Sequence, residues 1–125
     1  MNEENPLKNC IDLHTHSTAS DGSNAPGEIP RIAFEQGLAA VALTDHDTVG
    51  GIPEFLAAGE KYPLVELIPG VELAALYGSR ELHIVGLFID HESEALSDYL
   101  ARQREMRRRR NEEIMPSAAM RFSRR

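Results

Sequence analysis

Three residues of types that bind metal ions stand at alternate positions near the start of the chain. Asp12, His14 and His16 are each separated by one residue. Side chains on a β-strand alternate between its two faces, so all three would project from one face. Asp21 follows in an Asp-Gly turn that could fold a second carboxylate back toward them. This pattern predicts a site for a borderline metal ion, and the alternative is a half-buried strand with two hydrogen-bonded histidines.

Further histidines and acids recur where later strands are expected to end. Asp45 and His46 follow an apolar run, Glu72 ends the next expected strand, and His83 lies on a fourth. Functional residues of a parallel α/β sheet gather at the carboxyl ends of the strands and in the loops that follow. We therefore expect several metal ions to share one pocket at this edge, with Glu72 bridging two of them.

A pocket of this kind indicates hydrolysis by metal-activated water. Two ions about 3.5–4 Å apart lower the pKa of a bound water and stabilise the attacking and leaving oxygens of a phosphate ester. The chain has no Gly-x-Ser-x-Gly motif, no P-loop and no setting for a reactive cysteine. Hydroxide on a metal ion is therefore the expected nucleophile.

Several of these side chains also have structural interpretations. We expect Asp12 and Asp45 to orient ligand histidines rather than to bind metal themselves. Asp47 and the threonine after it could cap the helix that follows. His83, in an apolar strand, would ordinarily be a hydrogen-bonded core histidine, and the surrounding set of ligands favours a metal role. His91 is expected to be a solvated loop residue.

Strands and helices alternate along the chain. We expect strands over residues 10–16, 38–43, 65–73 and 81–89, and helices over about 29–37, 53–61 and 92–115. The continuously apolar run 38–43 is typical of a strand buried on both faces. Pro69-Gly70 predicts a kink or bulge in the third strand, and Pro116 is expected to end the last helix. The order strand, helix, strand, helix, strand predicts right-handed βαβ units and an α/β fold.

Composition indicates one soluble globular domain. The 125 residues are 42% hydrophobic and 26% charged. No apolar run approaches the roughly 20 residues that cross a bilayer, and the acidic N-terminus does not resemble a signal peptide. The single cysteine, Cys10, is expected in the core and fits a reducing cytoplasm, which is the expected location.

The net charge of −7 conceals two regions of opposite sign. Residues 1–100 hold four Lys or Arg against 17 Asp or Glu, whereas residues 101–125 hold nine Arg against three Glu. An acidic body that concentrates histidine favours a cation site over a nucleic-acid groove. The cluster Arg102, Arg104 and 107–110 leaves a nucleic-acid-binding module open as an alternative, and a solvated helix face diluted by Glu105 is the other interpretation.

The motifs together resemble the PHP (polymerase and histidinol phosphatase) family over roughly residues 10–110. They are Asp12-Leu13-His14-Thr15-His16-Ser17, Ser20-Asp21-Gly22, Leu43-Thr44-Asp45-His46-Asp47-Thr48, Pro69-Gly70-Val71-Glu72 and His83-Ile84-Val85-Gly86-Leu87. They are more similar to the family's stand-alone metal-dependent phosphoesterases, including the nucleoside 3′,5′-bisphosphate phosphatase type, than to its polymerase-fused members.

The resemblance implies a fold, a metal centre and a substrate class. The fold is a distorted (βα)7 barrel with a trinuclear centre of Mn²⁺, Zn²⁺ or Fe²⁺, and the substrate is a small phosphate ester or nucleotide. By motif, His14, His16 and Glu72 would serve one ion, and Asp21 and His46 a second. Glu72 and His83 would serve a third.

The chain departs from the family pattern in its second half. Family members are longer and carry a later histidine and an Asp-x-His pair, but no histidine follows His91 here. We therefore expect residues 10–114 to be the N-terminal portion of a PHP-like domain, incomplete in this chain. Residues 1–9 would be a lead-in, and residues 115–125 an unrelated tail. A metal-binding fragment without turnover is an alternative, and an uncovered barrel edge would favour self-association.

Overall fold

The computed structural model describes residues 8–122, with side chains described through residue 112. Most of the expected lead-in, residues 1–9, lies outside the described residues. The elements in chain order, with the two 3-10 helices labelled η, are β1 (Ile11–Thr15), η1 (Pro26–Glu28), α1 (Ile29–Glu35), β2 (Ala40–Leu43), α2 (Ile52–Ala58), η2 (Gly59–Lys61), β3 (Glu66–Tyr77), β4 (Arg80–Leu87) and α3 (Glu94–Phe122).

The strands form one sheet in the order β1-β2-β3-β4. β1 pairs with β2, and β2 with β3, in parallel, which confirms the α/β fold with parallel βα units. β4 pairs with β3 in antiparallel orientation and joins it through a tight hairpin, so His83 comes to the site along an antiparallel strand. The carboxyl ends of β1, of β2 and of the stretch of β3 that pairs with β2 therefore lie at one edge, as the sequence predicts.

β3 changes its partner at Pro69-Gly70. Residues 66–69 pair with β2, whereas residues 70–77 pair with β4. A Cβ atom on Gly70 would lie 2.8 Å from both Gly86 O and Thr44 Cγ2, so glycine permits the close approach at this point. The registers of β3 run without a shift, so the expected bulge is absent from its described pairings. The strand also extends past the expected residue 73 to Tyr77, because β4 supplies hydrogen-bond partners there.

The main hydrophobic core lies between one face of the sheet and helices α1 and α2. Val41 and Leu43 of β2 pack there against Ile29, Ile52 and Phe55. The alternate residues of β2 point to the opposite face, where Ala40 and Ala42 pack with Ile68. β2 is thus buried on both faces, as its continuous apolar run predicts.

Two expectations about the chain's outer elements are wrong. α3 continues past Pro116 to Phe122, because a proline removes one main-chain hydrogen bond and can kink a helix without ending it. Cys10 is exposed, since it precedes β1 at the open edge of the sheet. The unrelated nature of residues 115–125 stays a prediction.

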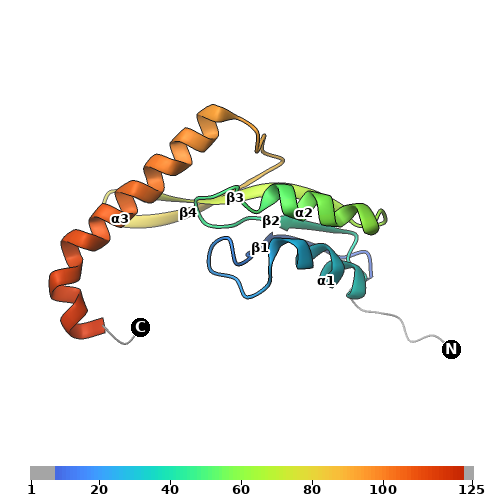
Figure 1. The fold of residues 1–125 in the computed structure, drawn as a ribbon, viewed down its shortest axis with the longest axis horizontal. Helices are drawn as coiled ribbons and strands as arrows, with labels where there is room; N and C mark the ends of the chain where they lie inside the picture. Colours follow the sequence, from blue (N-terminus) through green and yellow to red (C-terminus); the bar gives the residue numbers. More distant parts are fainter. Residues whose placement is uncertain (1–7, 123–125) are drawn as a thin grey trace.

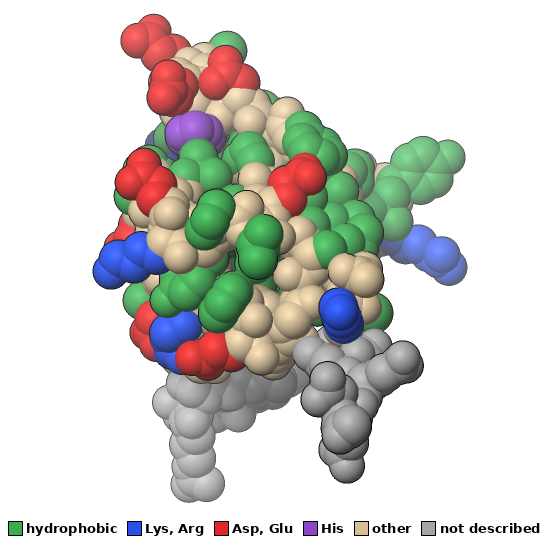
Figure 2. Space-filling model, turned by 90° about the vertical axis from the view of Figure 1, so that its right-hand side faces the viewer, with side chains coloured by type: hydrophobic (Ala, Val, Ile, Leu, Met, Phe, Trp, Pro, Cys, Tyr) green, Lys and Arg blue, Asp and Glu red, His purple; other side chains and the backbone are tan. Residues whose placement is uncertain are grey.

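α3 lies apart from the other two α-helices. In Figure 1 it crosses the left end of the molecule beside the β3–β4 hairpin, whereas α1 and α2 lie toward the right. Figure 2 views that right-hand end, where hydrophobic side chains are mixed with acidic and basic ones and no single sign of charge dominates. Among the described residues, no helix is both long and apolar enough to cross a membrane.

Candidate metal centre

Glu72 occupies the middle of the candidate metal centre, at the carboxyl edge of the parallel strands. The side chain is buried, with 6% of its surface exposed. Its backbone N–H donates to Asp45 O at 3.0 Å, and its backbone O accepts from the Asp47 N–H at 2.9 Å. These two hydrogen bonds extend the β2–β3 pairing beyond the end of β2 and form an isolated bridge between His46 and Glu72. The loop after β2 is therefore held against β3 beside the carboxylate.

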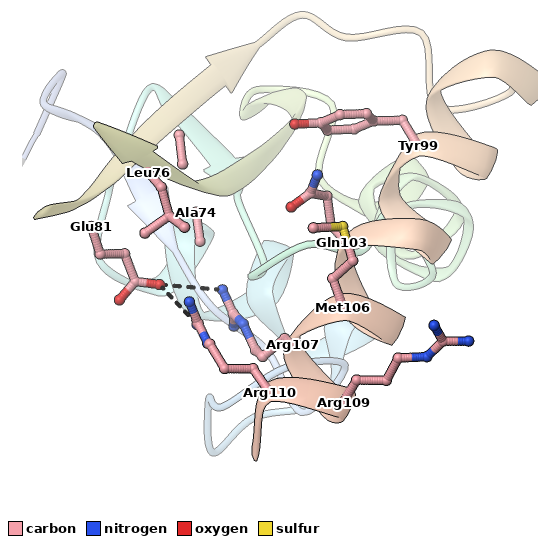
Figure 3. Close-up of a pocket in the computed structure, with 10 residues that line it drawn as sticks. Ala74, Leu76, Glu81, Tyr99, Gln103, Met106, Arg107, Arg109 and Arg110 are labelled. Atoms are coloured by element: carbon pink, nitrogen blue, oxygen red, sulfur yellow. Dashed lines mark ion pairs between the residues drawn. The ribbon is translucent and has the colours of Figure 1, made fainter. Parts of the chain in front are cut away.

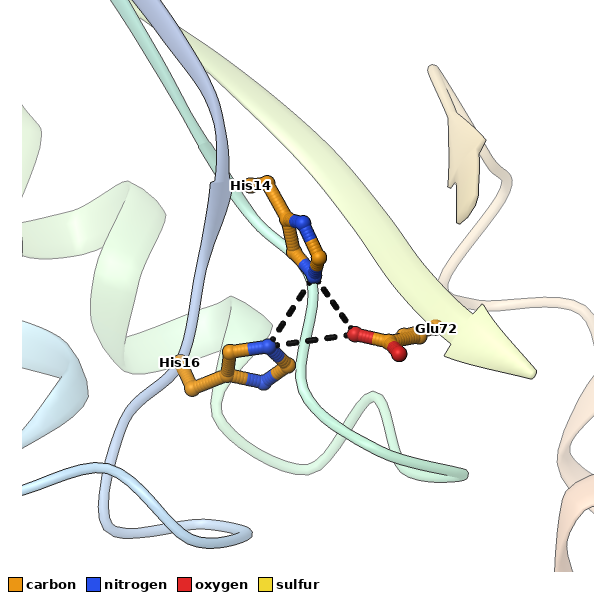
Figure 4. Close-up of side chains that lie close together, drawn as sticks. All are labelled: His14, His16 and Glu72. Atoms are coloured by element: carbon orange, nitrogen blue, oxygen red, sulfur yellow. Dashed lines mark hydrogen bonds and ion pairs between the residues drawn. The ribbon is translucent and has the colours of Figure 1, made fainter. Parts of the chain in front are cut away.

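The first group of possible ligands joins β1 to β3. His14 Nε2 lies 2.6 Å from Glu72 Oε1, and His16 Nε2 lies 3.1 Å from the same oxygen. The two imidazole Nε2 atoms are 3.1 Å apart, so the three donor atoms form a small triangle (Figure 4). His14 and His16 project to one place because they are two residues apart at the end of a strand.

Two more groups adjoin the first. His46 Nε2 lies 3.2 Å from Asp21 Oδ2, and His16 Nδ1 lies 3.6 Å from Asp21 Oδ1. Glu72 Oε2 lies 3.0 Å from His83 Nδ1 and 3.8 Å from His46 Nδ1. Each group offers three ligand atoms within 4.8 Å of one another, and His16, His46 and Glu72 each belong to two groups. The arrangement could hold three neighbouring cations.

The chemistry of this donor set fits a divalent transition metal. Imidazole nitrogens and carboxylate oxygens are the ligands that zinc, iron and manganese accept. Among the described residues, His16 Nδ1 is a buried polar atom with no hydrogen-bond partner, and it faces Asp21. A cation between the two would make Nδ1 the ligand atom of His16, whereas a cation in the first group would take Nε2, because a neutral imidazole has one free lone pair. The six residues present therefore fit a metal centre.

The electrostatics of Glu72 suit the same role. Burial by itself raises the pKa of this carboxyl group. The hydrogen bond with His14 and the charges of His46, His14 and His16 outweigh burial, so the pKa of Glu72 falls below its usual value. In the metal-free protein Glu72 is therefore ionised, and the ionised carboxylate is the form that binds a cation.

Asp12 and Asp45 accept hydrogen bonds from residues around these groups. Asp12 Oδ1 accepts the His14 N–H at 3.2 Å. Buried Asp45 accepts hydrogen bonds from the N–H and hydroxyl of Ser17, at 2.6 and 2.7 Å, and from the hydroxyl of Ser20 at 2.7 Å. Asp45 thereby folds the loop that carries Asp21 toward His46. His91 pairs with Glu92 at 3.9 Å and belongs to none of the three groups of described ligands.

The basic face of α3 lines the same site, which the sequence did not predict. A cavity of about 650 Å³ is bounded by Asp21, His46 and His83 on one side and by Arg104, Arg107, Arg108 and Arg110 of α3 on the other. A second cavity, of about 570 Å³, lies between α3 and the β3–β4 hairpin, and Glu81 pairs there with Arg107 and Arg110 at 3.9 Å each (Figure 3). A run of arginines was the available signal, but its spacing does not reveal which of them face inward.

Asp47 is a further residue whose contacts differ from the expectation. Asp47 does not cap α2. The N-cap residue of α2 is Gly51, and no side-chain hydrogen bond caps the helix there. The carboxylate Oδ2 of Asp47 instead lies 2.8 Å from Arg107 Nη2, across a separation of sixty positions that no local pattern reveals.

The chain resembles proteins of known family. The PHP domain model matches residues 12–114. The 5′-3′ exoribonuclease Rnm of Salmonella typhimurium is 44% identical over 103 residues, which span 79% of this chain and 34% of that protein. The 3′,5′-nucleoside bisphosphate phosphatase of Chromobacterium violaceum is 42% identical over 97 residues, which span 78% of this chain and 34% of the relative. The chain thus spans about a third of the length of these curated relatives.

A solved structure extends the likeness to the fold. A Bifidobacterium adolescentis protein described as a metal-dependent phosphoesterase superposes with a TM-score of 0.80 at 30% identity. The match covers 95% of this chain and 41% of that one. Together with the family match over most of the sequence, this likeness establishes that the chain belongs to the PHP domain family.

Proposed function

We propose that the metal centre of this chain serves the hydrolysis of phosphate esters. The observation that carries the proposal is the sharing of Glu72 by two groups of ligand atoms, with a third group next to them. Shared carboxylates hold neighbouring cations, and neighbouring cations suit the charged oxygens of a phosphate ester. The names of the relatives, a bisphosphate phosphatase and an exoribonuclease, make nucleotides the proposed substrate class.

Each residue has a proposed role at this centre. His14, His16 and Glu72 hold one ion, Asp21 and His46 a second, and Glu72 and His83 a third. Asp12 and Asp45 position the backbone that carries these ligands. Bound divalent ions would supply Lewis-acid activation of a water molecule and of the phosphoryl oxygens. Mn²⁺, Zn²⁺ and Fe²⁺ are all candidates, because imidazole and carboxylate ligands suit each of them.

A second candidate is metal binding without turnover. The match spans 34% of the length of the Salmonella typhimurium relative. The sequence contains no histidine after His91 that could complete the coordination of the ions. Under this alternative the three groups hold cations, but the substrate-contacting residues belong to a part of the family fold that this sequence does not contain.

Two kinds of macromolecular partner remain proposals. The arginines of α3 line the cavity beside the ligands, and one relative is named a 5′-3′ exoribonuclease, so single-stranded RNA is the proposed nucleic-acid partner. β4 is an edge strand on which Leu82, Ile84 and Val85 are exposed, so self-association through this edge is also proposed.

The decisive experiment measures bound metal and phosphate release on the same samples. The purified chain with added Mn²⁺ is assayed on an aryl phosphate and on nucleoside 3′,5′-bisphosphates. It is compared with the double variant His14→Ala, His46→Ala and with the control His91→Ala, which removes a histidine outside the groups. We expect the double variant to lose both metal and activity and the control to keep both.

The outcomes separate the candidates. Equal rates for the chain and the double variant would rule out hydrolysis at this centre. Metal retained after desalting, with no hydrolysis above blank, would favour binding without turnover. Absence of metal from the unaltered chain would count against both. Binding to single-stranded RNA that does not weaken with salt would count against a role for the arginines.

A further inference from the structure

Asp47 is the point at which three elements of the structure meet. Its side chain is 3% exposed, and its φ of 50° lies in the left-handed region that aspartate adopts more readily than most residues. It directly follows the candidate ligand His46. All of its polar groups have partners on other parts of the chain.

Two of these partners are on β3. The Asp47 N–H donates to Glu72 O at 2.9 Å, and Asp47 Oδ1 accepts the Ala74 N–H at 3.3 Å. Asp47 therefore attaches the loop after β2 to β3 at and just beyond Glu72. The two candidate ligands His46 and Glu72 are fixed relative to each other by this attachment.

The remaining partners are on α3. Arg104 Nη1 donates to Asp47 O at 2.7 Å, and Arg107 Nη2 lies 2.8 Å from Asp47 Oδ2. Among the described side chains of α3, residues 94–112, Leu100 is the only buried one. With so little apolar burial, the position of the helix over the metal centre depends on its charged contacts. Those with Asp47 are shorter than the 3.9 Å contacts of Arg107 and Arg110 with Glu81.

We propose that Asp47 is a positioning residue that couples α3 to the metal centre. Ions held by His46 and Glu72 restrain the loop and β3, and Asp47 transmits this restraint to Arg104 and Arg107. By the same linkage, the placement of α3 stabilises the arrangement of the ligands. The proposed coupling to bound metal ions rests on the proposed function, whereas the attachment of α3 by Asp47 does not.

The test is hydrogen–deuterium exchange of the α3 amides, measured by mass spectrometry on the full chain with and without Mn²⁺. The variants are Asp47→Asn and Arg107→Gln, which remove the ion pair from either side. The matched control is Arg109→Gln, on the same helix, whose guanidinium pairs with Glu105 at 3.1 Å. Metal content is measured in parallel.

Without metal, we expect α3 to exchange about tenfold faster in both variants than in the control, as fits the loss of a charge-assisted hydrogen bond. The double variant should exchange no faster than Arg107→Gln alone, since that variant already lacks the pair with Asp47 and the longer contact of Arg107 with Glu81. Mn²⁺ should slow α3 exchange in the unaltered chain and in the control, and in neither single variant, although the variants bind Mn²⁺.

Several results would overturn the inference. Unchanged α3 exchange in both single variants would show that Asp47 does not hold the helix. Equal slowing by Mn²⁺ in the variants and the control would show that the coupling runs elsewhere. If Asp47→Asn does not fold, Arg107→Gln decides the question, since Arg107 is partly exposed. If the unaltered chain binds none of Mn²⁺, Zn²⁺ and Fe²⁺, the coupling to metal and the proposed function both fail, while the metal-free comparison still decides the attachment of α3.

Discussion

Glu72 and His14 stand 58 positions apart in the sequence, and the atoms Oε1 and Nε2 of their side chains lie 2.6 Å apart. Their strands, β3 and β1, are not neighbours, because β2 lies between them. The contact is possible because the three strands run parallel to one another and their parallel pairing ends at the same edge of the sheet. A buried carboxylate is thereby placed within reach of imidazoles from three other segments.

Replacement of Glu72 is the sharpest test of this arrangement. Glu72→Gln keeps the size of the side chain but removes its charge, and Glu72 belongs to two of the three groups. We expect Mn²⁺ affinity to fall by about 100-fold or more, beyond the usual effect of a residue that only supports a ligand. Equilibrium dialysis with elemental analysis measures this, and His91→Ala serves as the control. Unchanged stoichiometry and affinity would remove Glu72 from the centre.

Much of this arrangement could be predicted from local patterns. The alternation of His14 and His16 indicates a common face, and the apolar run ending before Asp45 indicates a buried parallel strand. Together these two patterns predict that the ligands lie at one edge of the sheet, because parallel strands connected by helices have their carboxyl ends at the same edge. The convergence of His14, His16, His46 and Glu72 on one place follows from this topology, whereas His83 arrives on antiparallel β4.

Other features depend on contacts that no local pattern contains. The apolar pattern of residues 81–89 indicates a strand, but it does not give its direction or its pairing with β3. The anchoring of α3 depends on Arg104 and Asp47, which are 57 positions apart. An arginine-rich helix looks the same in sequence whether its charges face solvent or a carboxylate.

Asp45 provides a prediction about the loop that carries Asp21. Its buried carboxylate accepts three hydrogen bonds from Ser17 and Ser20. Asp45→Ala would leave these donors without their acceptor, so we expect the free energy of unfolding of the metal-free protein to fall by about 3 kcal/mol. Asp45→Asn keeps one acceptor oxygen and should cost less, about 1–2 kcal/mol.

Urea denaturation measures both changes. The control is Asp12→Ala, an exposed carboxylate with one hydrogen bond to the backbone, which should change stability by less than about 0.5 kcal/mol. Equal effects at positions 12 and 45 would contradict the role assigned to the buried carboxylate.

Gly70 provides a test of the point where β3 changes partner. A Cβ atom at this position would lie 2.8 Å from the backbone O of Gly86 and from Thr44 Cγ2, and 3.2 Å from Leu43 O. Since two of these atoms belong to backbone in paired strands, Gly70→Ala should force the strands apart and destabilise the protein by about 1–3 kcal/mol. Gly86→Ala is the matched control, because its nearest contact would be an ordinary 3.4 Å from Ile89 Cγ2. Thermal unfolding that ranks the two variants equally would show that the close approach is not a constraint.

Glu105 provides a test of the charge pattern on α3. Hydrogen bonds from Arg108 and Arg109 lower the pKa of this exposed carboxyl group to about 2. Because its pKa is lower in the helix than in the unfolded chain, its ionised form favours the helix above pH 4.5, and this contribution is lost as the pH falls toward 2.

A carboxyl ¹³C titration by NMR should therefore place the midpoint of Glu105 near 2. In the double variant Arg108→Gln, Arg109→Gln, the midpoint should rise toward the ordinary value of 4.5. Arg110→Gln is the control, because Arg110 pairs with Glu81 and should leave the midpoint of Glu105 where it is. A midpoint near 4.5 in the unaltered chain would mean that these arginines do not pair with Glu105 in solution.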